Sequence, residues 1–328
     1  MFSLFQIEKA LRDIEEVWAT MRLMVEVFKD KSYRIKSTEE LLQVLEEHVM
    51  TLSSMKSSQY YLPFSEKVDH WERTLASVGE VVELALAVQR SWMYLENIFI
   101  GTEDIRPHLP QESSWFDQIN AGFLSILESF YKAQLAIPAC CGRAGGSAAL
   151  LAELTEYSAM LEKIQKSLED YLEKKRQQFP RFYFLSNDDL LEILGQAKDP
   201  AQVQKHIKKC FEAIKQLEIT PPSKERGQKV WEANGMISPD GENVSFKMTK
   251  NVVLEPPVEA WLNQVESRMR ETLRKLLVVC HTENIAPKAS GAQKKEKWVK
   301  TFPGQLLITS GQISWTTDCW VWSSSIRL

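Results

Sequence analysis

Side chains that could do chemistry are scattered through this 328-residue sequence. Its histidines show neither an HExxH motif nor another paired-ligand spacing, and its cysteines form no CxxC pair. These residues are His48, His70, His108, His206 and His281, and Cys140, Cys141, Cys210, Cys280 and Cys319. No GxSxG elbow and no kinase loop accompanies them. We therefore predict no catalytic residue, no metal ligand and no cofactor-binding residue, and free thiols typical of a reducing compartment.

Two short stretches are typical of ligand sites, and each has a simpler interpretation. Asp188 and Asp189 could bind a cation, but acidic residues are also favoured in the first turn of a helix, where the helix dipole is positive. The Gly-rich stretch 138–147 could cradle a phosphate, but no glycine in the chain is followed by lysine, as a P-loop requires. We interpret the first stretch as the start of a helix and residues 137–147 as an irregular connector.

The charge balance bounds the possible partners. The chain has 40 basic and 44 acidic residues, a net charge of −4, so neither nucleic acid nor a membrane surface is favoured. No run of 18 apolar residues is present, and acidic residues interrupt the N-terminal region where a signal peptide would need a hydrophobic stretch. The sequence is typical of a cytoplasmic, soluble protein.

The elements that must position these side chains are mostly helices. Apolar residues recur every three or four positions, which indicates amphipathic helices packed in antiparallel bundles. Such seams occupy residues 7–28, 41–52, 71–95, 116–130, 150–171 and 258–280, and the seam at 150–171 has a heptad-like spacing typical of coiled coils. The predicted fold is therefore mainly α, with elongated multi-helix bundles.

The stretch of the chain that carries the most structural information is 179–194, FPRFYFLSNDDLLEIL. Pro180 should end the preceding helix, because the residue before a proline is pushed out of the α region. The apolar run 182–185 then predicts a short buried strand, with Phe182 and Phe184 facing the core. Ser186 or Asn187 can cap the following helix.

The pattern of residue types changes after residue 219. Ser238-Pro239-Asp240-Gly241 lies between two β-prone runs, which predicts a β-hairpin, because proline presets φ and glycine accepts a positive φ. Short helices are expected at 188–196 and 200–217, and strands at 306–322. The predicted domains are an N-terminal helical bundle (1–136), the connector (137–147), a second bundle with the aromatic strand 182–185 (148–218), and a region with the hairpin, a long helix and a strand-rich tail (219–328).

Three runs resemble one family in the expected order. They are the stretch 179–194, the run QRSWMYLENIF at 89–99 with LPQE at 109–112, and the run KWVKTFPGQ at 297–305 with Trp315-Thr316. Together they resemble the linker region of dynein heavy chains, the mechanical element just N-terminal to the motor's AAA ring, and an axonemal member in particular. From about Trp320 the sequence no longer resembles the family.

The resemblance implies a function. This chain would be the linker, a lever that lies across the AAA ring and changes its bend during the ATPase cycle, in microtubule-based movement. The family's ATP sites lie in AAA modules that this sequence lacks, so we expect no enzyme activity from the chain itself. The implied partners are the AAA ring and the dynein intermediate and light chains, with microtubules involved only indirectly. The implied location is the cytoskeleton of the cilium or flagellum, in the axoneme.

A second hypothesis stays open from the sequence. The chain could be a non-motor helical scaffold, or a truncated isoform, that binds other dynein subunits. The basic residues between Lys205 and Lys229 could then face an acidic partner, although such runs are more often solvated helix faces. An enzyme of another type is the third possibility, and the missing catalytic motifs disfavour it.

Overall fold

The computed structural model describes residues 3–28, 32–100, 103–222, 230–285 and 291–325. Helices make up 75% of these residues, and a small antiparallel sheet accompanies them, so the predicted mainly α fold is confirmed. Contacts divide the chain into two compact units, Met1–Glu169 and Asp170–Leu328. In the described part of the chain, no helix combines the length and the hydropathy needed to cross a bilayer.

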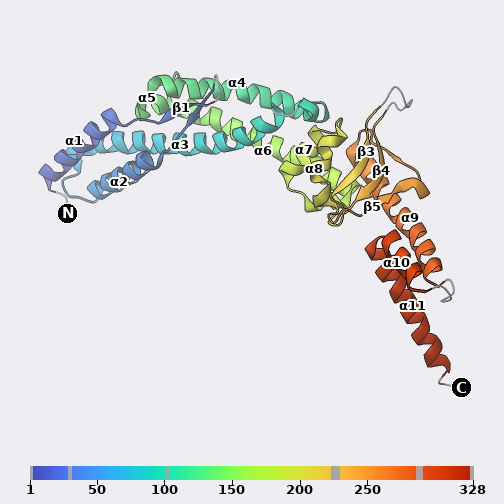
Figure 1. The fold of residues 1–328 in the computed structure, drawn as a ribbon. Helices are drawn as coiled ribbons and strands as arrows, with labels where there is room; N and C mark the ends of the chain where they lie inside the picture. Colours follow the sequence, from blue (N-terminus) through green and yellow to red (C-terminus); the bar gives the residue numbers. More distant parts are fainter. Residues whose placement is uncertain (1–2, 29–31, 101–102, 223–229, 286–290, 326–328) are drawn as a thin grey trace. The chain divides into compact units, whose positions relative to one another are not determined.

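The first unit is a helical bundle with one small hairpin (Figure 1). Its elements are α1 (Leu4–Thr20), β1 (Val25–Phe28), β2 (Ser32–Ile35), α2 (Glu39–Lys56), η1 (Leu62–Phe64), α3 (Ser65–Phe99), η2 (Glu103–His108), α4 (Pro110–Ala133), α5 (Ala136–Cys141) and the first part of α6 (Gly146–Gln178). Strands β1 and β2 pair antiparallel. The core lies between the apolar seams of these helices.

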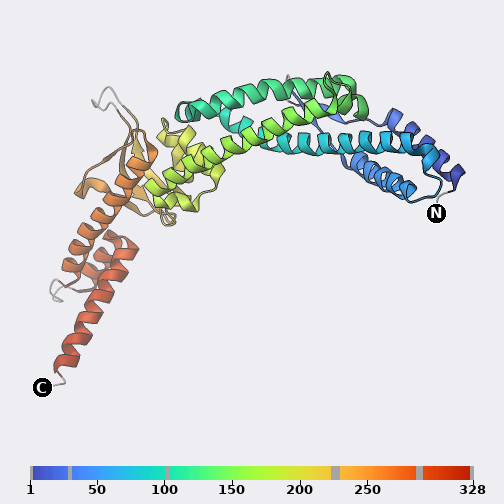
Figure 2. The ribbon, with the colours of Figure 1, turned by 180° about the vertical axis from the view of Figure 1, so that it is seen from behind.

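Helix α3 is the longest element of this unit, and α4 lies along it (Figures 1 and 2). The rings of Phe99 and Phe116 stack with centroids 5.4 Å apart. The indole of Trp92 donates a hydrogen bond of 2.9 Å to Asn120, so the buried tryptophan has its polar atom satisfied. Tyr157 of α6 approaches α4 so closely at Gly122 that a Cβ there would clash with the phenol oxygen.

A buried amide fixes the hairpin to α3. The Gln89 side chain accepts a hydrogen bond of 2.7 Å from the Ile35 amide and donates one of 3.0 Å to the Ile35 carbonyl. The last residue of β2 thus has both backbone polar groups paired across 54 residues of sequence. Burial of this strand end costs little, because neither group is left without a partner.

Two predictions for this half of the chain need correction. The first helix ends at Thr20, and the residues predicted to continue it form β1 instead. The connector predicted as irregular over 137–147 is helical up to Cys141, since Ala136, Ala139 and Cys140 bury one side of α5. The turn itself is short, and Gly145 and Gly146 adopt positive φ values of 90° and 72° there.

The second unit combines short helices, a sheet and a C-terminal helical hairpin (Figure 1). Its elements are the end of α6, η3 (Pro180–Phe184), α7 (Asn187–Gly195), α8 (Pro200–Cys210), β3 (Gln216–Thr220), β4 (Glu232–Ile237), β5 (Asn243–Ser245), η4 (Phe246–Met248), β6 (Val252–Val253), α9 (Val258–Ile285), α10 (Gly291–Thr301) and α11 (Gly304–Ser325). All sheet pairs are antiparallel, in the order β3-β4-β5, and β6 also pairs with β4.

The predicted hairpin is confirmed as the β4–β5 pair. Ser238 donates its amide hydrogen to the Glu242 carbonyl at 2.9 Å, and Gly241 donates to the Ser238 carbonyl at 3.1 Å. Gly241 has a φ of 89°, the positive value for which glycine is favoured.

Two other predictions in this half are wrong. The strands predicted at 306–322 are the helix α11, because Leu306 and Ser310, one turn apart, are buried, and Leu306 joins Cys280 and Phe302 in one apolar cluster. Packing on α9 therefore overrides the strand propensity of this stretch. The helix predicted at 200–217 ends at Cys210, and its last residues belong to β3.

The aromatic strand predicted at 182–185 is also wrong, because this stretch is the 3₁₀ helix η3. A 3₁₀ helix has three residues per turn, so Phe179, Phe182 and Leu185 lie on one side and are at most 5% exposed. Tyr183 and Phe184 point outward and are 55% and 74% exposed. The helix break predicted at Pro180 is confirmed, and of the two candidate caps, Ser186 and Asn187, the structure shows Ser186.

This geometry predicts unequal effects for two phenylalanines that are two residues apart. Phe182→Ala should lower the free energy of unfolding by about 3–5 kcal/mol, because it removes a buried ring and leaves a cavity. Phe184→Ala should change it by less than about 0.5 kcal/mol. Urea denaturation of both variants and the wild type measures the difference. Equal midpoints for the two variants would contradict the three-residue period.

Candidate functional site

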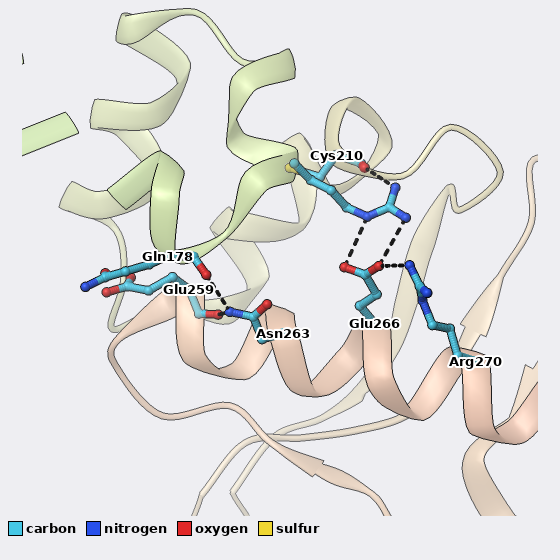
Figure 3. A network of polar contacts seen from close by, with 7 residues as sticks. Gln178, Cys210, Glu259, Asn263, Glu266 and Arg270 are labelled. Atoms are coloured by element: carbon cyan, nitrogen blue, oxygen red, sulfur yellow. Dashed lines mark hydrogen bonds and ion pairs between the residues drawn. The ribbon is translucent and has the colours of Figure 1, made fainter. Parts of the chain in front are cut away.

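A network of polar contacts in the second unit joins the end of α6 and η3 to α9. Figure 3 shows α9 carrying Glu259, Asn263, Glu266 and Arg270 on one side, one helical turn or less apart. This spacing of three or four residues puts the four side chains in one row. Their partners come from sequence about 85 residues earlier, so the row forms only after the chain has folded back.

A buried ion pair lies at the start of this row. The Nζ of Lys175 is 2.6 Å from an oxygen of Glu259, and the two side chains are 15% and 8% exposed. Lys175 also lies over the Tyr171 ring, 5.5 Å from its centroid. Burial, together with the Glu259 carboxylate, raises the pKa of the Tyr171 phenol to about 12. Removal of either partner of the pair would leave an uncompensated charge in a poorly hydrated place.

A second cluster surrounds Glu266. The guanidinium of Arg181 contacts both carboxylate oxygens, at 3.3 and 3.4 Å, and Arg270 donates to one of them at 2.6 Å. Arg181 also donates a hydrogen bond to the Cys210 carbonyl and lies 4.7 Å from the centroid of the Phe211 ring. One arginine of η3 thus contacts α9 and the end of α8 together.

The charge of Glu266 is stabilised by these contacts. Burial alone would raise the pKa of this carboxyl, but hydrogen bonds from Arg181 and then Arg270 outweigh it, and the pKa lies below its ordinary value. Glu266 is therefore an anion at neutral pH, and the cluster is strongest in that state.

The end of α6 is held by an amide. Asn263 donates hydrogen bonds of 2.9 Å to the carbonyls of Gln178 and Glu259 (Figure 3). The last carbonyls of a helix have no partner within the helix, so a side chain from α9 supplies one here. The site as a whole pairs cations with carboxylates and an amide with carbonyls, which fixes the register of three segments.

The histidines named in the sequence mostly have structural contacts. His48 accepts a hydrogen bond of 2.9 Å from the Trp18 indole, and His281 lies 3.4 Å from the Ser310 hydroxyl. All five cysteines are free. His206 is different, because the fold brings it to Asp189 and Glu192.

Sequence reasoning missed the row on α9, and of the His206 cluster it named only Asp189 as a possible cation ligand. The spacing of 259, 263, 266 and 270 along a helix is visible in the sequence, but their partners are not. The same holds for Asp189 and Glu192, which are three residues apart, while His206 follows on the next helix. The expectation of no catalytic or ligand residue remains a prediction.

The architecture defines the class: a mainly helical segment in which distant helices are joined by paired side chains. Residues 4–280 match the family model described as "Dynein heavy chain, N-terminal region 2". The chain is 49% identical over 317 residues to dynein axonemal heavy chain 2 of Homo sapiens, and 47% identical over 313 residues to the dynein-1-beta heavy chain of the flagellar inner arm I1 complex of Chlamydomonas reinhardtii. It is 34% identical over 312 residues to a cytoplasmic dynein heavy chain of Dictyostelium discoideum.

The chain therefore belongs to the dynein heavy chain family. Each of the first two alignments covers 95% of this chain and 7% of the relative, and the third covers 95% and 6%. The chain thus spans a small part of the length of these relatives. Within that part, the predicted resemblance to dynein heavy chains is confirmed, and the relatives with the higher identity are axonemal and flagellar.

The buried pair predicts a non-additive pattern of stabilities. Lys175→Met should lower the free energy of unfolding by about 3–5 kcal/mol, because Glu259 stays buried without its cation. The double variant Lys175→Met, Glu259→Leu should be clearly more stable than the single variant, since no charge is then left unpaired. Urea denaturation of the four proteins in the cycle measures the coupling, and additive effects would exclude the pair as a buried unit.

The lowered pKa of Glu266 predicts a pH dependence. Its stabilising contribution is complete above the pKa of an unfolded glutamate, about 4.3, and is lost as the pH falls through the lower folded value. Glu266→Gln should therefore destabilise the protein at pH 7, and the gap to wild type should narrow below about pH 4. Urea midpoints measured from pH 7 to pH 3.5 test this.

A surface carboxylate provides the matched control for this measurement. Glu296 pairs with Lys300 at 2.6 Å, and the two side chains are 65% and 71% exposed. Glu296→Gln should change stability by at most about 0.5 kcal/mol at pH 7. A gap for Glu266→Gln that stays constant down to pH 3.5 would contradict the assignment of a stabilised anion.

Proposed function

We propose that this chain is the linker segment of an axonemal dynein heavy chain, a mechanical element without an ATP site of its own. The polar row on α9 is the observation that carries this proposal. A segment that transmits force must keep its helices in register under load, and directional pairs such as Lys175–Glu259 and Arg181–Glu266 oppose sliding, whereas apolar contacts are non-directional.

The relatives support the axonemal part of the proposal. Two of them carry names that place them in flagellar or axonemal dyneins. By that likeness the partners of the segment are the AAA ring of the same heavy chain and the dynein intermediate and light chains, and the location is the axoneme of a cilium or flagellum. The lack of a P-loop motif in the sequence supports the part of the proposal that concerns ATP.

A chimeric motor tests the mechanical role. The segment that aligns with residues 4–280 is replaced in a Chlamydomonas inner-arm heavy chain by this sequence, and microtubule gliding and ATP turnover are measured on the purified motor. The wild-type segment should support gliding. The variant Arg181→Met, Glu266→Leu should glide severalfold more slowly with ATP turnover largely retained, because the ring still cycles while the joined helices yield.

Two controls separate the lever from a scaffold. Lys300→Gln, which removes an exposed pair, should leave gliding unchanged. A scaffold role predicts another pattern, in which the double variant glides normally but loses intermediate or light chains on gel filtration. That result would overturn the proposal.

A further inference from the structure

Two short helices bring three metal-type ligands together in the second unit. Helix α7 places Asp189 and Glu192 three residues apart, hence on the same side. Helix α8 places His206 against them, and one donor atom from each of the three residues lies within 4.8 Å of the other two. The three residues belong to one helix–turn–helix and are separate from the row on α9.

His206 distinguishes this cluster from a patch of acidic residues alone. His206 is 7% exposed, and neither of its ring nitrogens makes a hydrogen bond within the described structure. The Nδ1 atom lies 3.5 Å from Asp189 and the Nε2 atom 3.3 Å from Glu192. A buried imidazole with two unsatisfied nitrogens is costly, and a ligand that accepts a nitrogen lone pair would remove part of that cost.

The dimensions suit a small divalent cation. Bond lengths of about 2.1 Å and tetrahedral angles separate neighbouring ligands by about 3.4 Å. A single ion binds only one ring nitrogen of His206, so one of the two histidine–carboxylate distances, 3.5 Å from Nδ1 to Asp189 or 3.3 Å from Nε2 to Glu192, matches that value. The other carboxylate lies farther from the chosen nitrogen, within the 4.8 Å that contains one donor atom of each residue. The Glu192 side chain is 46% exposed, so it can rotate to close the wider separations. Imidazole nitrogen and carboxylate oxygen are both donors that zinc uses, and three protein ligands leave a fourth position for water.

A lysine already neutralises part of this site. The Nζ of Lys209 is 2.8 Å from both oxygens of Asp189, and this contact, opposed by partial burial and aided by Ser186, lowers the pKa of the Asp189 carboxyl. The Lys209 side chain is 52% exposed, so it can leave toward solvent when another cation arrives. The ammonium and a metal ion then compete for the same carboxylate.

We propose that Asp189, Glu192 and His206 form a site for a zinc-type divalent cation that fastens α7 to α8. Lys209 occupies Asp189 when the metal is absent. This proposal departs from the expectation that the sequence holds no metal ligand, and it does not depend on the mechanical role proposed above.

Calorimetric titration of Zn²⁺ into the full chain at pH 7.4, with a phosphine reductant, tests the site. Every protein in this experiment also carries Cys319→Ser, because an exposed thiol would itself bind zinc. One equivalent should bind and raise the melting temperature. His206→Gln should weaken binding by about tenfold or more, and Glu192→Gln, which changes a half-exposed side chain, should do so without unfolding the protein. Lys209→Gln should strengthen binding, because the competing ammonium is gone.

The matched control is His70→Gln, which removes an exposed imidazole in the other unit and should leave the isotherm unchanged. Circular dichroism confirms that each variant is folded. The proposal is overturned if no zinc binds, in which case His206 is only a buried side chain packed between two carboxylates. Zinc uptake that Glu192→Gln and Lys209→Gln leave unchanged also overturns it, because the metal then binds elsewhere.

Discussion

The second unit depends on how it accommodates the buried carboxylate of Glu259. Removing such a charge from water is costly, and the cost is offset only if a cation reaches it with good geometry. Lys175 does so at 2.6 Å, and this places the last turns of α6 beside the first turn of α9. Asn263 and Glu266 follow on the same side of α9 and meet Gln178 and Arg181 in turn. The contacts are consistent with one another, because a shift of α9 by one residue would misplace every partner in the row.

The 3₁₀ turn between α6 and α7 is what allows this row to form. Its three-residue period buries Phe179, Phe182 and Leu185 on one side, and Arg181 points instead to Glu266 and the end of α8. A strand at this place would have alternated its side chains and turned Phe184 inward. The outward position of Phe184 therefore follows from the same backbone that directs Arg181.

How far the sequence predicts this structure depends on the range of the interaction. Local chemistry was read correctly where one residue decides the outcome, as with the break at Pro180, the cap at Ser186 and the turn at Gly241. Predictions failed where distant packing decides, as in α11, whose buried side lies on α9, and in β3, which needs β4 as its partner. The polar row and the His206 cluster are hardest to predict, because each joins residues that no single periodicity connects.

The ion pairs between distant segments have a role that differs from that of apolar packing. A buried ion pair is weak evidence for high stability, since apolar residues of similar volume often serve as well. Its particular property is geometric: an arginine that contacts both oxygens of a carboxylate accepts few alternative positions, whereas an apolar surface permits sliding at small cost. Lys175 lies near the end of the 33-residue helix α6, Arg181 follows on η3, and Asn263 on α9 contacts the last residue of α6, so directional contacts gather where α6 ends. We infer that this arrangement serves register more than stability, as the mechanical role proposed above requires.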